Sequence, residues 1–471
     1  MTAEGWERRF ERAAHLLYIP LEGCSPRTAH ERPQMILRPG QRVFTVSSQL
    51  PITIGQSIGE GGQGEVYLGD LSGQQVAVKW YFPYYPHQED VRQRLQYLIT
   101  NGAPSDRFLW PFALVNCPNV PSFGYAMQLV ERSFQTLPDL WSQEPRPSLR
   151  VLATVGMNLA HSFLQVHAKG LCYRDISDRN IFYDPRSGEI RIADNDNVGV
   201  KDKPGEVAGT WEYMAPEVAR GETAPNRATD LHSLAVVLFQ IFMVQHPLQG
   251  KKELAIPPNL SQENRIRFYG KEPVFIFDPV DHSNEPIPGY AEYDNALHYW
   301  PIYPQFVRNL FIRAFTTGLH DPVNGRVAEG EWRQAFSRLR DCIFHCPKCG
   351  EENIFDEDAT RAANGAMQPC RQCGAAPPIP PHIRIGANRV MLNRDTQLYP
   401  HHVDNHRLYD FSRPVAAVSA WNPPALQNLS ATKWTVRAAE GATSEVPQGS
   451  AATLADRSTI YFGTSEGAVR L

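Results

Sequence analysis

Four of the eight cysteines fall into two C-x-x-C pairs, Cys346-Pro-Lys-Cys349 and Cys370-Arg-Gln-Cys373, and a glycine follows each pair. Two such pairs, separated by twenty residues, are typical of a tetrahedral four-cysteine zinc site rather than of a disulfide framework. The glycines allow the tight turn that follows each pair of thiolates. Because all four ligands are cysteines, the spacing favours a structural zinc ribbon over a catalytic centre, which keeps one coordination position open.

A second stretch whose residues could take part in a reaction is the octet Tyr173-Arg-Asp-Ile-Ser-Asp-Arg-Asn180. In it, Asp175 precedes Asn180 by five residues. At this spacing the carboxylate can orient a substrate hydroxyl and accept its proton, and the amide can hold a metal ion. The same string also arises by chance, in a solvated turn between a helix and a strand. For the octet alone these two interpretations are balanced, and the flanking sequence must decide between them.

Composition limits the class of protein. The 471 residues suffice for several domains, and the 42% hydrophobic fraction suits globular ones. The 46 Lys and Arg against 50 Asp and Glu argue against a general nucleic-acid binder. The start, Met1 to Arg12, lacks the apolar region of a signal peptide, and the most apolar run, Leu234 to Val244, is too short to span a bilayer. That run predicts a buried core helix, and we expect a cytoplasmic protein.

Upstream of the octet lies a glycine-rich loop that precedes a strand ending in lysine. Its glycines let backbone amides approach phosphates closely, although similar glycines also form ordinary hairpin turns. The apolar alternation predicts two strands around the loop instead of the strand-to-helix setting of a dinucleotide site. The residues of this segment that could line a nucleotide site are Ile58, Gly59, Gly61, Gly62, Gly64, Val66, Ala77 and Lys79.

Four further motifs follow the octet in order. They are Ile192-Ala-Asp194-Asn195-Asp196-Asn197, Gly209-Thr210 with Ala215-Pro216-Glu217, Asp230 at the start of the apolar helix, and Asn324-Gly325-Arg326. The whole ordered set, over residues about 50 to 340, resembles the eukaryotic-like protein kinases. The octet then corresponds to the family's catalytic loop, with Tyr173 in place of its histidine. The resemblance implies an α+β fold of two lobes that binds ATP between them.

The resemblance also implies a role for each motif. Asp175, Lys79 and Asn180 would be the catalytic residues, with Asp175 positioning the acceptor hydroxyl and Lys79 orienting the phosphates. Asn180 and Asp194 would hold Mg²⁺ or Mn²⁺. The glycine-rich loop would cover the phosphates, and Met127 would lie at the back of the ATP pocket. Asp230 and the pair formed by Glu217 and Arg326 would be structural braces.

Three positions depart from the family pattern. In the expected helix from Gln88 to Thr100, Gln93 or Arg94 stands where kinases place the glutamate that pairs with the strand lysine, so the partner of Lys79 is open. Asn195 and Asp196 replace the Phe and Gly of the D-F-G motif, which suggests a restricted in/out switch. Asp196 is also a hypothetical additional metal-facing carboxylate.

The third departure concerns Arg174, which resembles the arginine that receives an activation-loop phosphate. The segment from Val198 to Gly209 contains no Ser, Thr or Tyr to carry one. We expect that Asp202, Glu206 or a partner protein meets Arg174, the alternative being that its side chain packs on backbone carbonyls.

Ser177 and Arg179 leave the choice between Ser/Thr and Tyr acceptors open, whereas Gly209-Thr210 favours Ser/Thr. His161 and His167, in a helix from Leu149 to Ala168, are expected at the helix surface or in packing, and not as ligands.

The predicted organisation is multidomain. An N-terminal extension (1–50) precedes a kinase domain (51–341), whose small lobe covers about 51–130 and whose large lobe covers 131–341 with a Pro-rich insert from Leu248 to Pro304. A zinc ribbon (342–376) and an all-β sandwich (382–471) follow. The sandwich resembles forkhead-associated domains in Gln427-Asn-Leu-Ser430 and Leu454 to Gly463, but no phosphothreonine-binding Arg and Ser can be placed.

These features favour an active kinase that uses ATP, Mg²⁺ and structural Zn²⁺ and modifies a protein substrate. A pseudokinase scaffold that only binds partners is the alternative. The combination of a kinase with these C-terminal regions resembles bacterial kinases that act with a PP2C-type phosphatase and a von Willebrand A-like protein. This resemblance implies such partners. We expect neither a membrane nor a nucleic acid as partner.

Overall fold

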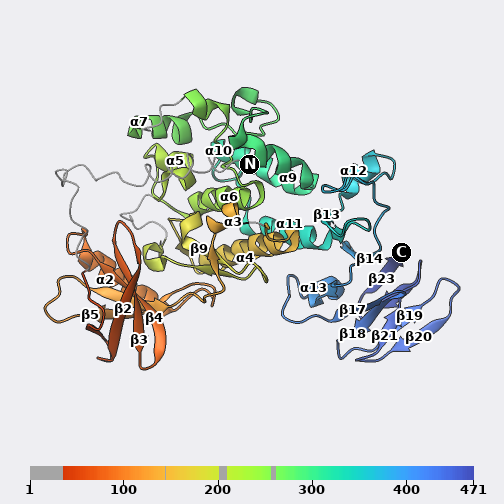
Figure 1. Cartoon of the computed structure of the whole chain (residues 1–471), viewed down its shortest axis with the longest axis horizontal. Helices are drawn as coiled ribbons and strands as arrows, with labels where there is room; N and C mark the ends of the chain where they lie inside the picture. The colour runs from red at the N-terminus through yellow and green to blue at the C-terminus, as the bar shows by residue number, and fades with distance from the viewer. Residues whose placement is uncertain (1–35, 144, 201–208, 256–260) are drawn as a thin grey trace.

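The computed structural model describes residues 36–143, 145–200, 209–255 and 261–471. Three parts follow one another along the long axis of the molecule (Figure 1). A small β-rich lobe with one long helix comes first, a larger helical lobe occupies the middle, and β-rich regions lie at the C-terminal end. Among the described residues, no helix is both long and apolar enough to cross a membrane.

The small lobe is a closed barrel of six strands in the order β1-β2-β3-β4-β6-β5. The strands are β1 (Arg42–Thr45), β2 (Pro51–Glu60), β3 (Gly64–Leu71), β4 (Gln74–Tyr81), β5 (Pro111–Asn116) and β6 (Gly124–Gln128). β1 pairs with both β2 and β5, and its Val43 is fully buried. The predicted boundary at residue 50 is therefore wrong, because β1 closes the barrel before it.

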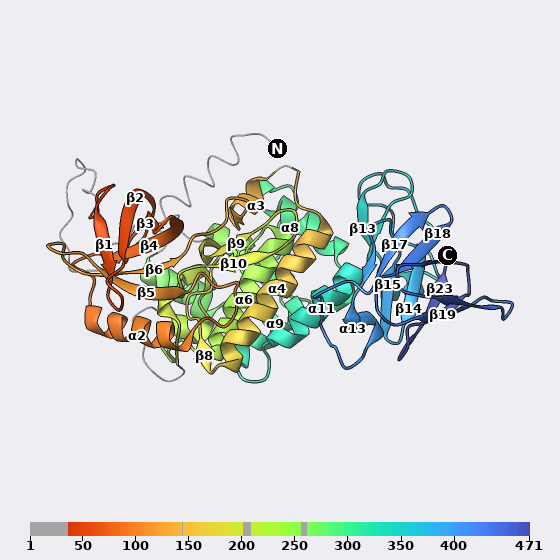
Figure 2. The same ribbon diagram turned by 90° about the horizontal axis from the view of Figure 1, so that it is seen from below.

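The helix α2 (Gln88–Asn101) packs along the barrel next to β5, as Figure 2 shows. Val91, Leu95 and Leu98, spaced at three and four residues, are its buried positions. This confirms the helix expected from Gln88 to Thr100. Since the apolar stripe faces the barrel, the neighbouring position of Arg94 is turned toward the cleft between the lobes.

The large lobe is built around α4 (Leu149–Ala168) and α6 (Arg227–Met243). The α6 segment from Thr229 to Phe239 is buried throughout, which confirms the predicted core helix. Asn226 caps α6 by accepting hydrogen bonds from the amides of Ala228 and Thr229. The remaining helices of the lobe core are α3 (Asp139–Ser142), α5 (Pro216–Ala219), α9 (Gln305–Phe315), α10 (Thr317–His320) and α11 (Glu329–Asp341).

The segments around the octet and Asp194 form short elements. They are β7 (Gln135–Thr136), β8 (Leu171–Cys172), η1 (Asp178–Asn180), β9 (Ile181–Tyr183), β10 (Ile190–Ile192), η2 (Asn195–Asn197), β11 (Gly199–Val200) and η3 (Trp211–Tyr213). Of these, β7 precedes α4, and the others lie between α4 and α6 in the chain. β9 pairs with β10, and β8 pairs with β11. These two antiparallel pairs hold the octet and the Asp194 segment side by side.

The described part of the Pro-rich segment from Leu248 to Pro304 is a packed structure. Phe275, Ile276 and Tyr303 are buried in the same core as α6. Its elements are η4 (Lys251–Ala255), α7 (Gln262–Arg265), η5 (Ile266–Lys271), η6 (His282–Asn284), η7 (Ala291–Tyr293), α8 (Asp294–Tyr299) and η8 (Trp300–Ile302). This part of the chain extends the large-lobe core.

The C-terminal part begins with the cysteine-bearing segment, which contains β12 (Ile343–His345), β13 (Glu352–Ile354) and α12 (Glu357–Ala362). Two antiparallel sheets follow and share one hydrophobic core that includes Ile383, Leu426 and Trp434. The six-stranded sheet contains β14 (His382–Ile385), β15 (Asn388–Met391), β19 (Trp434–Arg437), β20 (Thr443–Val446), β22 (Thr459–Tyr461) and β23 (Glu466–Arg470). The four-stranded sheet contains β16 (Gln397–Leu398), β17 (Ala416–Trp421), β18 (Pro424–Asn428) and β21 (Ala451–Thr453). The arrangement is β-rich, as expected.

The two-sheet region is held on the large lobe by polar contacts. On α13 (Pro400–Val403), His402 Nε2 lies 3.1 Å from Asp341 Oδ1 at the end of α11. Asn393 Nδ2 donates to the carbonyl of Ile343 at 2.8 Å. The C-terminal region therefore contacts the large lobe directly, in addition to being joined to it by the chain.

Candidate active site

Lys79 lies at the centre of the cleft. Its Nζ is 2.5 Å from Asp194 Oδ1, 2.9 Å from Asp196 Oδ2 and 2.8 Å from Gln63 Oε1 in the glycine-rich loop. Burial disfavours the lysine cation, but the two carboxylates outweigh burial and hold the pKa of Lys79 above its ordinary value. The lysine is thus paired with acids from the Asp194 segment.

The helix α2, all of whose residues are described, supplies no acid to Lys79. Its two carboxylates, Glu89 and Asp90, stand in the first turn with about 70% of each side chain exposed. Gln93 is exposed and donates to Glu89 Oε1, whereas Arg94 Nε donates to the carbonyl of Asp196 at 2.6 Å. Of the two residues left open for the glutamate position, Arg94 is the one that contacts the Asp194 segment, and its cation cannot pair with a lysine.

The segment after Asp194 is fixed by side-chain hydrogen bonds. Asp194 has a left-handed backbone (φ 53°, ψ 47°) and leads into the single turn of η2. Asn195 Nδ2 donates to the carbonyls of Leu109 at 3.0 Å and Ile192 at 2.9 Å. An amide bound to backbone oxygens replaces the family's phenylalanine, which supports the expected restriction of the in/out switch.

Asp230 holds the start of the octet. Its Oδ2 accepts from the amide of Tyr173 at 2.6 Å, and its Oδ1 accepts from the amide of Arg174 at 2.9 Å. The Tyr173 hydroxyl donates to the carbonyl of Ala193, directly before Asp194. The predicted brace is confirmed, and Tyr173 adds a link between the octet and the Asp194 segment.

The second predicted brace joins Glu217 and Arg326. Arg326 Nη2 lies 2.7 Å from Glu217 Oε2, and both residues are buried. Arg326 also donates to the backbone carbonyls of Gly318 and Ala228. This pairing is confirmed as well.

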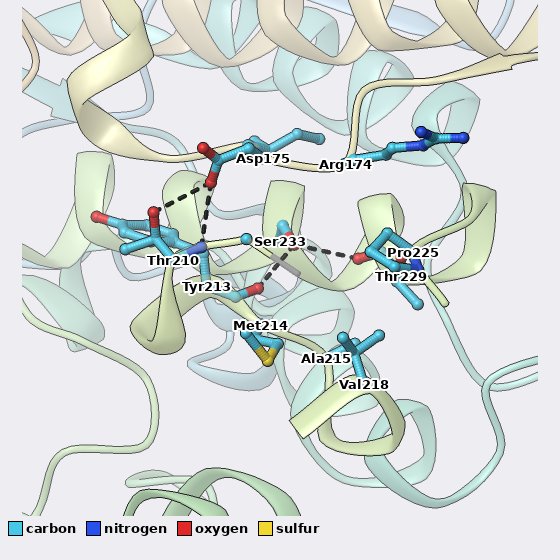
Figure 3. Close-up of a pocket in the computed structure, with 12 residues that line it drawn as sticks. Arg174, Asp175, Thr210, Tyr213, Met214, Ala215, Val218, Pro225, Thr229 and Ser233 are labelled. Atoms are coloured by element: carbon cyan, nitrogen blue, oxygen red, sulfur yellow. Dashed lines mark hydrogen bonds between the residues drawn. The ribbon is translucent and has the colours of Figure 1, made fainter. Parts of the chain in front are cut away.

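Asp175 is bound to Thr210 by two hydrogen bonds. Its Oδ1 accepts from the Thr210 amide at 3.1 Å and from Thr210 Oγ1 at 3.0 Å (Figure 3). Burial raises the pKa of Asp175, while the two bonds from Thr210 oppose that rise. Gly209 has a φ of 96°, and a Cβ there would come within 3.1 Å of the Arg174 carbonyl, so glycine is needed for this approach.

Asn180 turns back toward the octet. Its Nδ2 donates to the carbonyl of Asp175 at 2.9 Å, which commits the amide nitrogen and directs the amide oxygen away from that bond. An oxygen presented in this way suits a hard cation such as Mg²⁺. The Asp194 side chain, 31% exposed, is the nearby carboxylate that is open to the cleft. These two side chains therefore fit the proposed metal site.

A pocket of about 10 Å³ adjoins Asp175 and Thr210. The residues of η3, α5 and α6 close it, and Ser233 on α6 donates to the carbonyl of Tyr213 at 2.7 Å (Figure 3). Its apolar lining consists of Ile176, Met214, Ala215, Val218 and Pro225. Arg174, Asp175, Thr210, Tyr213, Thr229 and Ser233 line it as well, so the small cavity beside the carboxylate has a mixed polar and apolar lining.

Arg174 is buried and directed away from Asp175 (Figure 3). Its Nε donates to Cys172 Sγ at 3.5 Å, and a Cβ on Gly199 would come within 2.7 Å of its guanidinium carbon. The guanidinium therefore packs against the backbone of Gly199. The expected partners Asp202 and Glu206 lie outside the described residues.

Three of the expected nucleotide-binding residues form one apolar wall. Ala77 on β4 stands opposite Met127 on β6, and both belong to a cluster that also includes Val66 and Ala193. Ile58, by contrast, is 45% exposed on β2. The wall faces the cleft that holds Lys79, as an adenine pocket requires.

The glycines of the loop differ in their surroundings. A Cβ on Gly64 would lie 2.1 Å from the carbonyl of Trp80, so strand packing alone demands glycine there. A Cβ on Gly59 would meet only Val66, and Cβ atoms on Gly61 and Gly62 would meet no atom of the described residues within 4 Å. The last two glycines lie at the open tip of the loop, where a phosphate could approach.

Sequence reasoning missed Gln63 and Tyr81 as members of this site. The Tyr81 hydroxyl donates to Asp196 Oδ2, and Gln63 binds both Lys79 and, at 3.4 Å, Asn197. The sequence could have predicted Tyr81, because this residue follows Lys79 by two positions and therefore lies on the same face of β4. Gln63 carried no such signal beyond its place between glycines.

The four cysteines of the two C-x-x-C pairs come together. Cys346 Sγ is 3.8 Å from Cys373 Sγ, and Cys349 Sγ is 3.6 Å from Cys370 Sγ. Tetrahedral ligands at a Zn–S distance of about 2.3 Å stand about 3.8 Å apart, so the cluster fits zinc. Asn353 Nδ2 lies 3.4 Å from Cys370 Sγ and supports that thiolate from outside the cluster.

A second group, Asp341 with His401 and His402, also has potential ligand atoms close together. His402 Nδ1 accepts from the amide of Tyr399 at 2.9 Å, so in the neutral ring Nε2 carries the proton that Asp341 accepts. A ring with both nitrogens engaged in this way has no lone pair for a metal. This group is a hydrogen-bonded contact between α11 and α13.

Comparison with known proteins agrees with the cleft geometry. Residues 126–275 match the protein kinase domain family. A probable serine/threonine-protein kinase of Corynebacterium efficiens is 25% identical over 223 residues, covering 45% of this chain and 33% of that protein. A probable serine/threonine-protein kinase of Arabidopsis thaliana is 30% identical over 209 residues, covering 42% of this chain and 19% of that protein.

Relatives of a different acceptor class are also similar. The tyrosine-protein kinase MasK of Myxococcus xanthus is 27% identical over 233 residues, covering 44% of this chain and 35% of that protein. The chain thus spans between 19% and 35% of the length of these three relatives. Together with the cleft around Lys79 and Asp175, these similarities show that the chain contains a protein kinase domain, which β-rich regions follow.

Proposed function

We propose that the chain is an ATP-dependent protein kinase that transfers the γ-phosphate of ATP to Ser or Thr hydroxyls of a partner protein. The observation that carries this proposal is the pair of hydrogen bonds by which Thr210 holds Asp175 in one orientation, beside the cleft that contains Lys79. A carboxylate held in one orientation beside a binding surface can align an incoming hydroxyl and accept its proton.

Each of the following residues would have its own role in the transfer. Asp175 orients the acceptor hydroxyl through the oxygen that Thr210 helps to position. Lys79, buried at the base of the cleft, orients the phosphates of ATP. Asn180 and Asp194 would hold Mg²⁺ or Mn²⁺, whose charge offsets the charge that develops on the transferring phosphoryl group. Val66, Ala77 and Met127 would contact the adenine.

The proposed acceptor class, Ser or Thr, is supported by Thr210 and by the relatives. The hydroxyl of Thr210 donates to Asp175 Oδ1, and Thr210 lines the same small cavity as Met214 and Ala215. The serine/threonine kinases among the relatives support this choice, although a tyrosine kinase is similar too.

The C-terminal regions would recruit partners. We propose that Cys346, Cys349, Cys370 and Cys373 hold a structural Zn²⁺, since their sulfur spacing fits the tetrahedral geometry. The two-sheet region resembling forkhead-associated domains would present a binding face, with a PP2C-type phosphatase and a von Willebrand A-like protein as candidate partners. Because the region is docked on α11, a bound partner would lie close to the kinase domain.

A pseudokinase scaffold is the second candidate function. The observation that favours it is the replacement of the helix glutamate by Arg94, which removes the usual partner of the lysine. Against it stand Lys79, Asp175, Asn180 and Asp194, which lie around one cleft and keep the side chains that phosphotransfer requires.

The test is a transfer assay with the full chain. Radiolabelled ATP is supplied with Mg²⁺ or Mn²⁺ and a peptide library that carries a single Ser, Thr or Tyr acceptor. We expect label on Ser or Thr peptides with wild type and its loss in Asp175→Ala, while both proteins bind ATP with similar affinity in calorimetry. ATP binding without transfer under either metal would establish the scaffold instead, and label on Tyr peptides alone would overturn the acceptor class.

A further inference from the structure

Asp196 is the most completely buried acid in the cleft. Its side chain is 1% exposed, and one oxygen, Oδ2, lies 2.9 Å from Lys79 Nζ and accepts from the Tyr81 hydroxyl. Burying a carboxylate is costly unless it is paired and hydrogen-bonded, and here both partners come from β4. Asp196 and Lys79 therefore form a unit that the small lobe and the Asp194 segment share.

Asp194 is a poor candidate for the permanent partner of Lys79. It is 31% exposed toward the cleft, and its carboxylate is the one that fits the proposed metal site. A divalent cation at that site would compete with Lys79 for Asp194. Asp196, which is buried behind Asp194, keeps its contact with Lys79 in either case.

The surroundings of Asp196 fix its position from several sides. Arg94 Nε on α2 donates to its backbone carbonyl, and Asn195 anchors the same turn to the carbonyl of Leu109. Helix α2 thus still supports the lysine pair, but it does so through the backbone of the turn that carries the acid. In the family pattern the helix supplies the acid and the turn carries a glycine at this position, whereas here the helix carries a cation and the turn carries the acid.

We infer that Asp196 is the positioning residue of Lys79, and that it supplies from the turn after Asp194 the carboxylate that α2 lacks. The inference deepens the proposed function, on which its consequence for catalysis rests. This role differs from the metal-facing one considered above: Oδ2 contacts Lys79 and Tyr81, while Oδ1 is buried without a hydrogen-bond partner among the described residues.

The experiment is a double-mutant cycle on ATP affinity. Calorimetry measures Mg·ATP binding to full-length wild type, Asp196→Asn, Lys79→Met and the double variant Lys79→Met/Asp196→Asn. We expect Asp196→Asn to weaken binding on the order of tenfold, and to have little further effect when Lys79 is already methionine. The matched control is Glu89→Gln, an exposed acid on α2, which leaves the affinity unchanged.

Additive losses in the cycle would overturn the inference, because Asp196 would then act independently of Lys79. Unchanged ATP affinity in Asp196→Asn, combined with a weaker dependence on Mg²⁺, would also overturn it and assign Asp196 to the metal. If Asp196→Asn is too unstable to assay, the double variant, which has no charge at position 196 or 79, is compared with Lys79→Met alone, and equal affinities support the inference. Binding needs no turnover, so the inference is tested even if the chain transfers no phosphate.

Discussion

His167 Nε2 on α4 lies 3.0 Å from Asp230 Oδ2 on α6, directly behind the octet. The other ring nitrogen of His167 contacts the carboxylate of Glu329, which also pairs with Arg227 at 2.8 Å. The side chain of His167 is buried, so of the two expected settings, the helix surface or packing, the structure has the packed one. The carboxylate that holds the backbone of Tyr173 and Arg174 is itself held by this histidine.

The first prediction concerns the pH dependence of this contact. Burial disfavours the imidazolium, but the hydrogen bonds to Asp230 and Glu329 outweigh burial and raise the pKa of His167 above its ordinary value. A raised folded-state pKa stabilises the fold below the unfolded pKa of about 6.5, and that stabilisation is lost as pH rises through the folded-state value. The difference in free energy of unfolding between wild type and His167→Gln should therefore be largest at acidic pH and shrink above it.

Urea unfolding at several pH values measures this difference. His320→Gln, at the exposed end of α10, is the control and should change the free energy of unfolding by less than about 0.5 kcal/mol. A difference that grows with rising pH would contradict the prediction.

The second prediction concerns Thr210. Replacement by valine removes the hydroxyl donor to Asp175 but keeps the shape and the backbone amide. A hydrogen bond to a carboxylate contributes about 1.5 kcal/mol, so kcat should fall roughly tenfold. Because this donor opposes the raised pKa of Asp175, its loss should also shift the acidic limb of the pH–rate profile to higher pH.

Steady-state kinetics across pH tests both effects. Thr210→Ser keeps the hydroxyl and should retain most of the activity with an unshifted limb. A Thr210→Val variant with wild-type kcat would show that Asp175 is oriented by other contacts.

The third prediction concerns the buried pair of Glu217 and Arg326. Glu217→Ala leaves the Arg326 cation buried without its counter-charge and should lower the free energy of unfolding by about 3–5 kcal/mol. The control is Glu285→Ala, whose pair with Lys251 is exposed to solvent and should therefore change the free energy of unfolding far less. Chemical unfolding followed by circular dichroism measures both, and equal losses would contradict the prediction.

The fourth prediction concerns zinc. Atomic absorption should find one zinc per chain in the wild type and none in Cys349→Ser/Cys370→Ser, since two of four thiolates are then missing. Chelation should lower the melting temperature and speed hydrogen exchange in the segment that includes β12 and β13, because metal binding stabilises such small modules. Cys117→Ser, in the small lobe, should keep its zinc. Full zinc retention in the double variant would rule out this site.

Local spacing in the sequence was enough to predict the helices α2 and α6 and the two cysteine pairs. It was also enough to single out Lys79, Asp175, Asn180 and Asp194, which the structure brings to one cleft. Such features depend on residues a few positions apart, and their side-chain periodicity or chelate spacing is readable without knowledge of the fold. The first strand was missed because β1 is a short segment whose place is set only by pairing with β2 and β5.

The tertiary structure alone decided which groups meet Lys79 and Asp230. Asp196 reaches Lys79 across 117 residues of sequence, and His167 reaches Asp230 across 63. Whether a buried charge is satisfied depends on every element packed around it, and sequence spacing carries no such information. The motifs therefore indicated where the chemistry lies, whereas the packing of α2, α4 and α6 around them determined how each charged side chain is held.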